Sequence, residues 1–342
     1  MKSAVAYILT SLAPVPLLLL AASEGGVFAW AALIYLTLFT FLLDEVLATA
    51  LEAKPTRTFA DALCIALAIA HFAVLIAVLL AFQRGMGPGE GVALFLAAGL
   101  FLGQISNANG HELIHRGGRV LQVLGKWIYI SLLFGHHCSA HRLVHHRFVA
   151  SNRDPNSARL GESYYRFAVR AWIGSFRAGL REENQRLVDI PPWRHPYFDY
   201  AIGALICLTF SYVLAGPTGL LIHLALAGYA QSQLLISDYV QHYGLRRASQ
   251  PDGKLEPVND SHSWNSPHWF SSHLMLNAPR HSSHHSHPMR PFPELDIAPE
   301  APTLPYSLPA MSVLALIPPL WRRVMDPQVA LWQAPIAQKA AA

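Results

Sequence analysis

The chain has 342 residues, of which 53% are hydrophobic and 13% are charged, and its net charge is +4. Soluble proteins carry about 25% charged residues, so this composition excludes an ordinary soluble domain and favours the lipid bilayer as solvent. The basic residues are spread along segments that flank apolar runs and form no single stripe, so we expect no nucleic-acid partner. Three scattered cysteines provide neither a disulfide framework nor a Cys-x-x-Cys pair.

Six apolar runs are close to the length of about 20 residues with which a helix crosses the hydrocarbon core. We predict transmembrane helices at residues 4–22, 27–43, 59–82, 92–106, 198–215 and 220–236. The first run could be a signal peptide, but its length, its internal prolines and the run directly after it favour a retained helix. No repeat, low-complexity tract or linker divides the chain, so we predict one all-α membrane-embedded domain over residues 1–342.

The positions of the basic residues predict the orientation of these helices, because Lys and Arg accumulate in cytoplasmic loops. The three connections that we expect outside hold one basic residue, Arg84, and the inner segments hold nearly all the others. We therefore predict that both termini and two long segments, 107–197 and 237–327, are cytoplasmic.

Nine histidines fall in four groups within these two cytoplasmic segments. They are His111, His115, His141, His145, His146, His242, His281, His284 and His285. Imidazole is the commonest side-chain ligand for iron, copper and zinc. On a helix, His111 and His115 are one turn apart and can bind one ion, whereas His141 shares a face with His145 and His146 is turned by about 100°. Nine nitrogens suit two ions with four or five ligands each.

Other interpretations of the histidines are weaker. The first group reads His-Glu-Leu-Ile-His, which is also the zinc metalloprotease signature, but one protease zinc needs only three protein ligands. A metal transporter would need ligands along the membrane midplane, where these groups do not fall. His71 and His223 lie inside apolar runs, and we expect them to make hydrogen bonds between helices. Six further histidines do not follow this spacing, and we expect that they are not metal ligands. They are His136, His137, His262, His268, His273 and His287.

Around the nine histidines the chain resembles the integral-membrane alkane 1-monooxygenases, also called alkane ω-hydroxylases. The family's boxes HELxHK, EHxxGHH, NYxEHYGL and LQRHSDHH correspond to residues 111–116, 140–146, 238–245 and 278–285. Shorter stretches such as Asp154-Pro155 are also similar, and the resemblance covers nearly the whole chain. It implies a fatty-acid-desaturase-like fold, in which six transmembrane helices carry a cytoplasmic, histidine-rich di-iron cap.

The resemblance also implies a function. It indicates a non-haem di-iron monooxygenase that uses O2 to hydroxylate the terminal methyl group of medium-chain n-alkanes to 1-alkanols, with the nine histidines holding two iron ions. It implies electrons from rubredoxin and an NADH-dependent rubredoxin reductase, and a multi-pass location in the lipid of a bacterial inner membrane with cytoplasmic termini. The chain has no flavin, iron–sulfur or Rossmann motif of its own, which agrees with an external donor. A xylene-type methyl monooxygenase and a membrane fatty-acid desaturase or hydroxylase remain alternatives, although the usual desaturase box is HxxHH where this chain has HxxxHH.

Three carboxylates of the family's boxes are absent, because Ala140, Gln241 and Ser283 stand in their places. Carboxylates beside ligand histidines commonly accept the free ring N–H and raise ligand basicity. We expect other acidic residues to take over part of this role, and the candidates are Glu112, Asp238 and Asp260.

An alkane offers no polar group for recognition, so the shape of a tunnel between helices must select the length of this apolar substrate. We predict that the second helix and its neighbours line the tunnel, and that bulky side chains of the second helix set the chain length, or else face lipid. These residues are Trp30, Tyr35, Leu36 and Phe39.

Overall fold

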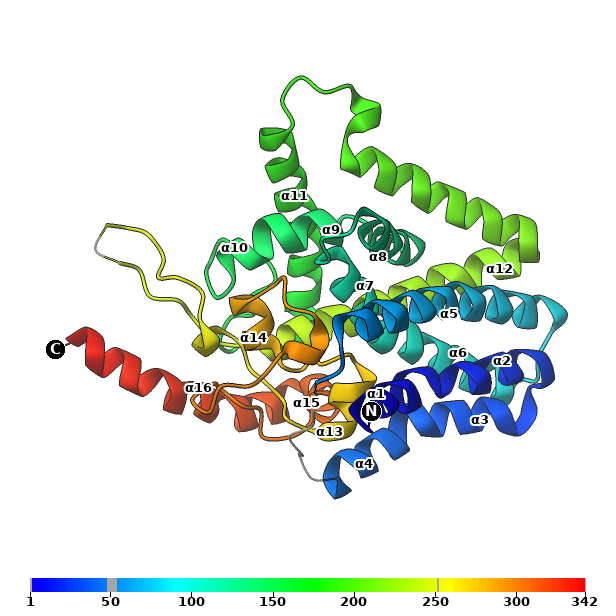
Figure 1. Cartoon of the computed structure of the whole chain (residues 1–342), viewed down its shortest axis with the longest axis horizontal. Helices are drawn as coiled ribbons and strands as arrows, with labels where there is room; N and C mark the ends of the chain where they lie inside the picture. The colour runs from blue at the N-terminus through cyan, green and yellow to red at the C-terminus, as the bar shows by residue number, and fades with distance from the viewer. Residues whose placement is uncertain (1, 48–53, 251, 342) are drawn as a thin grey trace.

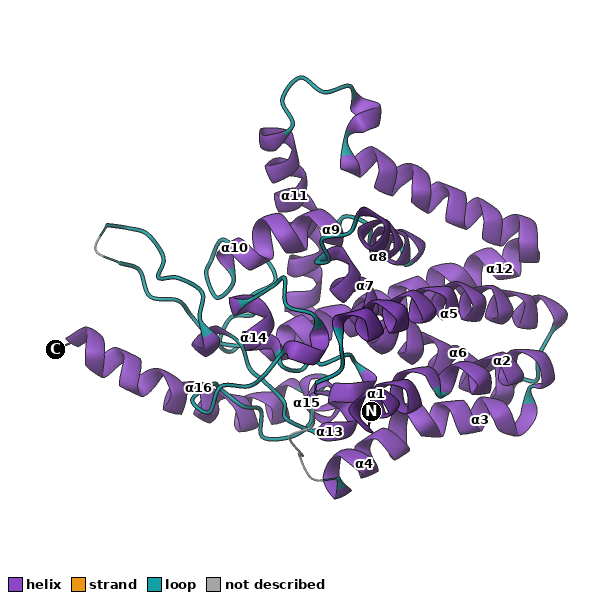
Figure 2. Ribbon diagram, viewed as in Figure 1, coloured by secondary structure: helices purple, strands orange, loops and turns teal. Residues whose placement is uncertain are grey.

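A computed structural model describes residues 2–47, 54–250 and 252–341. Over these residues the protein is helical, and its only β-structure consists of two isolated bridges. Figure 2 shows the helices and the long loops that connect those of the second half. The all-α fold that the sequence predicts is confirmed.

Four helical stretches in the first third of the chain are long and apolar enough to cross a membrane, and each contains a predicted span. They are Ser3–Glu24, Gly26–Val46, Arg57–Arg84 and Pro88–Ile114. Their elements are α1 (Lys2–Tyr7), α2 (Pro14–Glu24), α3 (Gly26–Ile34), α4 (Thr40–Val46), α5 (Arg57–Arg84), α6 (Pro88–Leu100) and α7 (Asn107–Ile114). Three π-helical turns, η1 (Ile8–Leu12), η2 (Tyr35–Phe39) and η3 (Phe101–Ser106), join these helices. The fourth stretch therefore runs past its predicted end and carries the first histidine box.

The last two predicted spans form a single element, α12 (Pro196–His242), which has 47 residues. A single crossing needs only about 20 residues. Non-helical backbone angles at Ala215 and Gly216 interrupt the helix, and the φ of 62° at Gly216 is one that glycine adopts without steric cost. The two arms fold back on each other (Figure 1), and Ser211 Oγ lies 2.7 Å from His223 Nδ1 across the hairpin. The described residues thus contain five membrane-span candidates where the sequence predicted six, because the last candidate joins two helical arms across a sharp bend at the predicted boundary.

The remaining helices belong to the polar segments. Between α7 and α12 lie α8 (Arg119–Ser131), α9 (His137–Ala140), the π turn η4 (His141–His145), α10 (His146–Phe148) and α11 (Tyr164–Arg186). After α12 come α13 (Trp269–Leu274), α14 (His281–Ser286), α15 (Leu308–Ala315) and α16 (Pro318–Ala341). Figure 1 shows α7, α10 and α14 near one end of the bundle that α5, α6 and the second arm of α12 form.

Two histidines inside the apolar helices connect those helices, as predicted. His71 Nε2 in α5 lies 2.7 Å from Ser131 Oγ, and His223 Nε2 lies 2.6 Å from the Ser131 carbonyl oxygen. Hydrogen bonds between helices satisfy polar groups that lipid cannot. Because His223 also contacts Ser211, this chain of contacts links α5, α8 and both arms of α12.

Two glycines four residues apart bring η3 and the end of α6 close to the second arm of α12. A Cβ atom at Gly99 would lie 2.0 Å from Tyr229 Cδ1, and a Cβ atom at Gly103 would lie 2.4 Å from Gln233 Cγ. Small residues at this spacing let membrane helices pack with their backbones close together. Asn107 Nδ2 then donates to one carbonyl on each helix, at 2.8 and 3.0 Å.

Candidate metal centre

All nine histidines of the four boxes converge in two neighbouring groups. The first group consists of His111, His115, His141, His146 and His284. The second group consists of His145, His242, His281 and His285. Within each group the candidate ligand nitrogens lie within 4.8 Å of one another, and none of the six histidines near the boxes joins either group in the described part of the chain. The folding of distant segments thus produces one site with five nitrogens and one with four.

The second box is wound differently from the prediction, because its residues form the π turn η4. A π turn bonds residue i to residue i+5, so residues five apart lie on one face. His141 and His146 therefore join the first group, with Nε2 atoms 2.9 Å apart, and His145 turns to the second. The α-helical spacing that the sequence argument assumed, with His141 and His145 on one face and His146 turned away, is therefore wrong for this segment.

Ordinary helical spacing holds in the other boxes. His111 in α7 and His115, the residue directly after α7, are one turn apart and both belong to the first group. In α14, His281 and His285 are also one turn apart and belong to the second group, whereas His284 belongs to the first. His242, the last residue of α12, completes the second group, with its Nε2 atom 3.0 Å from that of His281.

The arrangement of the nitrogens in the first group fits binding of a cation and does not fit hydrogen bonds between the rings. His146 Nε2 lies 3.2, 2.9 and 3.0 Å from the Nε2 atoms of His115, His141 and His284. One imidazole nitrogen has either one proton or one lone pair, so it cannot satisfy three such partners together. Burial, reinforced by the neighbouring histidines, holds the pKa of each of these four rings well below its usual value. The rings are therefore neutral, the form in which imidazole binds metal.

In the second group, a carboxylate sets the orientation of one ring. His145 Nδ1 donates to Asp154 Oδ2 at 2.8 Å, and Ser157 Oγ donates to the same oxygen at 2.6 Å. Burial opposes a charge on His145, but the Asp154 carboxylate outweighs it and raises the pKa of the ring. His145 Nε2 is buried and has no hydrogen-bond partner among the described residues. A ring held in this way presents a basic lone pair, which is the usual support for a metal-binding histidine.

The three carboxylates that the sequence suggested for this role make their hydrogen bonds elsewhere, although the charge of Asp238, after that of Asp154, also raises the pKa of His145. Each accepts a hydrogen bond from a group outside the two histidine groups: Glu112 from the Phe292 N–H, Asp238 from Asn156 and Asp260 from Ser286. Among the described residues, the carboxylate that hydrogen-bonds a ring of either group is Asp154, which the sequence argument did not select. Its one signal was the Asp-Pro pair shared with the alkane 1-monooxygenases.

The positions that lack the family's carboxylates have packing roles. Gln241 Nε2 donates to the Ala278 carbonyl at 3.0 Å, and Ser283 Oγ accepts a backbone N–H at 3.3 Å. Ala140 lies against α11, where a Cβ atom on Gly179 would come within 3.1 Å of the Ala140 Cα atom. These three side chains therefore hold neighbouring segments together and add no charge to the site.

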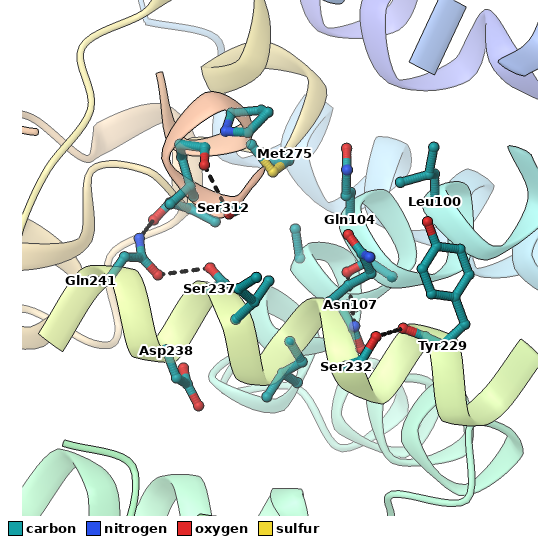
Figure 3. A pocket seen from close by; sticks show the side chains of 18 of the residues that line it. Leu100, Gln104, Asn107, Tyr229, Ser232, Ser237, Asp238, Gln241, Met275 and Ser312 are labelled. Carbon is teal, nitrogen blue, oxygen red and sulfur yellow. Dashed lines mark hydrogen bonds between the residues drawn. The ribbon is translucent and has the colours of Figure 1, made fainter. Parts of the chain in front are cut away.

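A cavity of about 430 Å³ reaches the histidines from between the apolar helices. Its lining includes His111 and His141 of the first group and His281 of the second. Figure 3 shows the wall formed by the second arm of α12, with Tyr229, Ser237 and Gln241 along it. The space therefore connects both histidine groups with the membrane-facing bundle.

One of the four residues predicted to line a substrate tunnel, Leu36, lines this cavity. The other three lie outside its described lining. Trp30 and Phe39 expose 47% and 40% of their surface, and the Tyr35 hydroxyl donates to the Leu9 carbonyl at 3.0 Å. The lining instead draws on seven separate stretches of the chain, which are 33–41, 96–111, 129–141, Tyr164, 229–241, 275–281 and 308–316.

Comparison with known proteins agrees with this geometry. The fatty acid desaturase family matches residues 88–315, which include all nine histidines. Alkane 1-monooxygenase of Pseudomonas putida is 33% identical over 253 residues, which are 73% of this chain and 63% of that protein. Alkane 1-monooxygenase 1 of Pseudomonas aeruginosa is 33% identical over 262 residues, which are 75% of this chain and 68% of that protein.

A more distant relative is the xylene/toluene monooxygenase hydroxylase component of Pseudomonas putida, which is 29% identical over 62% of this chain and 57% of its own length. This chain thus spans about two thirds, or slightly less, of the curated relatives it matches. The matched region nevertheless contains both histidine groups and most of the cavity lining. The chain belongs to the fatty acid desaturase family and, within it, to the alkane 1-monooxygenases.

Proposed function

We propose that the protein is a non-haem di-iron monooxygenase that hydroxylates the terminal methyl group of medium-chain n-alkanes to 1-alkanols with O2. The observation that carries this proposal is the cavity between apolar helices that ends on His111, His141 and His281. A chain lying in this space would bring one end to both histidine groups. The names of the relatives, alkane 1-monooxygenases, support the same reaction.

The two histidine groups would hold one iron ion each, with five and four nitrogens. A bound di-iron centre supplies the reductive activation of O2. The contribution of the chain is to keep the rings of the first group neutral by burial, to orient His145 through Asp154, and to exclude water from the reacting carbon. Apolar lining residues such as Leu36, Leu96 and Leu100 would hold the alkane by shape.

Two electrons per turnover must come from outside the chain, and we propose rubredoxin, reduced by an NADH-dependent rubredoxin reductase, as their source. Exposed basic residues lie within and after the second histidine box, at Arg142, Arg147 and Arg153. A positive surface of this kind accelerates docking of an acidic partner. The distribution of Lys and Arg further supports a bacterial inner membrane with both termini cytoplasmic.

Elemental analysis of the detergent-solubilised protein, combined with product analysis, tests this function. We expect two irons per chain, and 1-octanol from n-octane when rubredoxin, its reductase, NADH and O2 are present. The variant His285→Ala should lose iron and form no 1-octanol. The control His287→Ala changes an exposed histidine two residues away and should retain both. One zinc without iron, or unchanged 1-octanol formation by His285→Ala, would contradict the proposal.

A methyl group on an aromatic ring is the second candidate substrate, because one matched relative is a xylene/toluene monooxygenase component. Three tyrosines, Tyr129, Tyr164 and Tyr229, line the cavity and could pack against a ring. Replacing octane by m-xylene in the same assay separates the two. A benzylic alcohol without 1-octanol would favour the aromatic substrate, and an unsaturated acyl product would indicate a desaturase.

A further inference from the structure

Most polar side chains that line the cavity are satisfied by the protein itself. Seven of the lining side chains donate a hydrogen bond to another group of the protein, and these belong to Asn107, Tyr129, Tyr164, Ser232, Ser237, Gln241 and Ser312. Three others, Gln104, Tyr229 and Gln233, have side chains without a hydrogen-bond partner in the described part of the chain. Gln104 Oε1 is in addition fully buried. We call these three residues the polar patch.

The polar patch lies where η3 crosses the second arm of α12. Gly103, which precedes Gln104, packs on the Gln233 side chain, and Gly99 packs on the Tyr229 ring. Figure 3 shows Gln104 and the Tyr229 hydroxyl on the same side of α12, beside Leu100. The Gln104 and Tyr229 side chains therefore face one region of the cavity, and Gln233 also belongs to the lining.

This region is distant from the histidines. Gln104 precedes His111 by seven residues, and Tyr229 precedes His242 by thirteen. At 1.5 Å per residue along a helix, these separations amount to about 10 and about 20 Å. A molecule with one end at the histidines can thus place its other end at the polar patch.

The chemistry of the patch selects the kind of end group that fits. A buried amide without a partner costs free energy that a bound hydrogen-bonding group recovers, and an alkane cannot recover it. A hydroxyl both donates and accepts, so it satisfies the Gln104 amide in either orientation and the Tyr229 hydroxyl as well. The described lining contains no Lys or Arg but includes Asp238, so a carboxylate end group would be buried without a cation. The patch therefore favours a neutral hydroxyl.

We propose that the substrates include linear chains that carry a neutral hydroxyl at the end opposite to the oxidised methyl group. This inference rests on the proposed function and adds a second class of substrate to it. In the reaction the terminal C–H bond breaks and a C–O bond forms with one atom of O2. The second oxygen atom leaves as water with two protons and the two electrons that rubredoxin supplies, and the product is an α,ω-diol.

Competition between n-decane and 1-nonanol tests the proposal, because 1-nonanol has a hydroxyl in the place of one terminal methyl group of n-decane. In the variants Gln104→Leu and Tyr229→Phe, the ratio of kcat/KM for 1-nonanol to that for n-decane should fall roughly 2- to 10-fold, the effect of one lost neutral hydrogen bond. Tyr212→Phe is the matched control, because Tyr212 is 53% exposed on the first arm of α12, and the ratio should not change. An unchanged ratio in both patch variants, or no diol from wild-type protein that does oxidise n-decane, would overturn the proposal.

A binding measurement separates failure of this proposal from failure of the proposed function. We expect 1-nonanol to raise the melting temperature of the wild-type protein in detergent more than that of Gln104→Leu. This measurement needs no turnover, so it tests the role of the patch even if the protein oxidises neither compound. A lack of oxidation of both compounds would count against the hydroxylase function alone. Equal stabilisation of both proteins would reject the polar patch as a binding site.

Discussion

The charge of Asp154 determines which nitrogen of His145 is free for a metal ion. Because Nδ1 donates to Asp154 Oδ2 at 2.8 Å, the lone pair remains on Nε2, which belongs to the second histidine group. In the variant Asp154→Asn the amide can offer its own N–H to Nδ1 and favour the opposite tautomer. We expect iron affinity at the second group to fall about 10- to 100-fold, as measured by competition with a chelator.

Asp252→Asn provides the control for this substitution, because it removes the same charge from an exposed position and should not change iron binding. Iron binding by Asp154→Asn with wild-type affinity would show that the carboxylate only packs against the ring.

Leu36 is the predicted tunnel residue that lines the cavity, and it is 3% exposed. In Leu36→Phe the larger side chain shortens the space open to an alkane. Each methylene that no longer fits costs about 1–3 kcal/mol, so kcat/KM for the longest accepted alkane should fall roughly 10- to 200-fold, with shorter chains less affected. Gas chromatography of products from a series of n-alkanes measures this. Leu38→Phe is the control, because Leu38 is 68% exposed two residues later, and it should leave the product profile unchanged. If Leu36→Phe gave the same product profile as Leu38→Phe, the cavity would not be the substrate site.

The π turn at residues 141–145 shows where sequence reasoning about an element succeeds and where it stops. Imidazole spacing identified every histidine that the two groups contain, because ligand chemistry depends on residue type. The same spacing, taken as α-helical, put His141 and His145 on one face, whereas the structure places them in different groups, because the sequence of these five residues does not distinguish an α-helix from a π turn. The sequence feature that agrees with a π turn is the HxxxHH box itself, because its first and last histidines are five residues apart and share a face only in a π turn.

The close contact between η3, the end of α6 and α12 gives a second prediction at the level of helices. In Gly99→Ala the new Cβ atom would lie 2.0 Å from the Tyr229 ring, so the helices must separate or the ring must move. We expect a loss of about 1–3 kcal/mol in the free energy of unfolding, the usual cost of overpacking, seen as a lower melting temperature in detergent. Gly228→Ala has open space around its Cβ atom and should be neutral or slightly stabilising. Equal melting temperatures for the two variants would contradict the tight packing.

Across the whole molecule, apolar runs predicted the spans well because the bilayer imposes a length on any crossing helix. In the sequence, the bend at Ala215 and Gly216 is marked by a Gly-Pro pair between the last two apolar runs. Whether this pair separates two helices or bends one helix depends on backbone angles, which hydropathy does not report. The cavity lining was less predictable, because α4, η3, α12, α14 and α15 contribute to it from distant parts of the chain. Asp154 was missed for the same reason, since its contact with His145 depends on a turn and not on a periodic element.

The distribution of charge over the molecule leads to a prediction about electron supply. Arg142, Arg147 and Arg153 are exposed around the helices that carry the second histidine box, so an acidic donor docking there would approach both histidine groups. In the double variant Arg142→Glu/Arg147→Glu, kcat/KM for reduced rubredoxin should fall about 10-fold or more at low salt, because charge complementarity acts mainly on the association rate. The difference should shrink as salt rises, since the screening length falls from about 30 Å at 0.01 M to about 8 Å at 0.15 M. Arg84→Glu changes an exposed charge at the last residue of α5, the end of that helix away from the histidines, and should have little effect. Turnover at limiting rubredoxin that is independent of both salt and the two arginines would place the docking site on another surface.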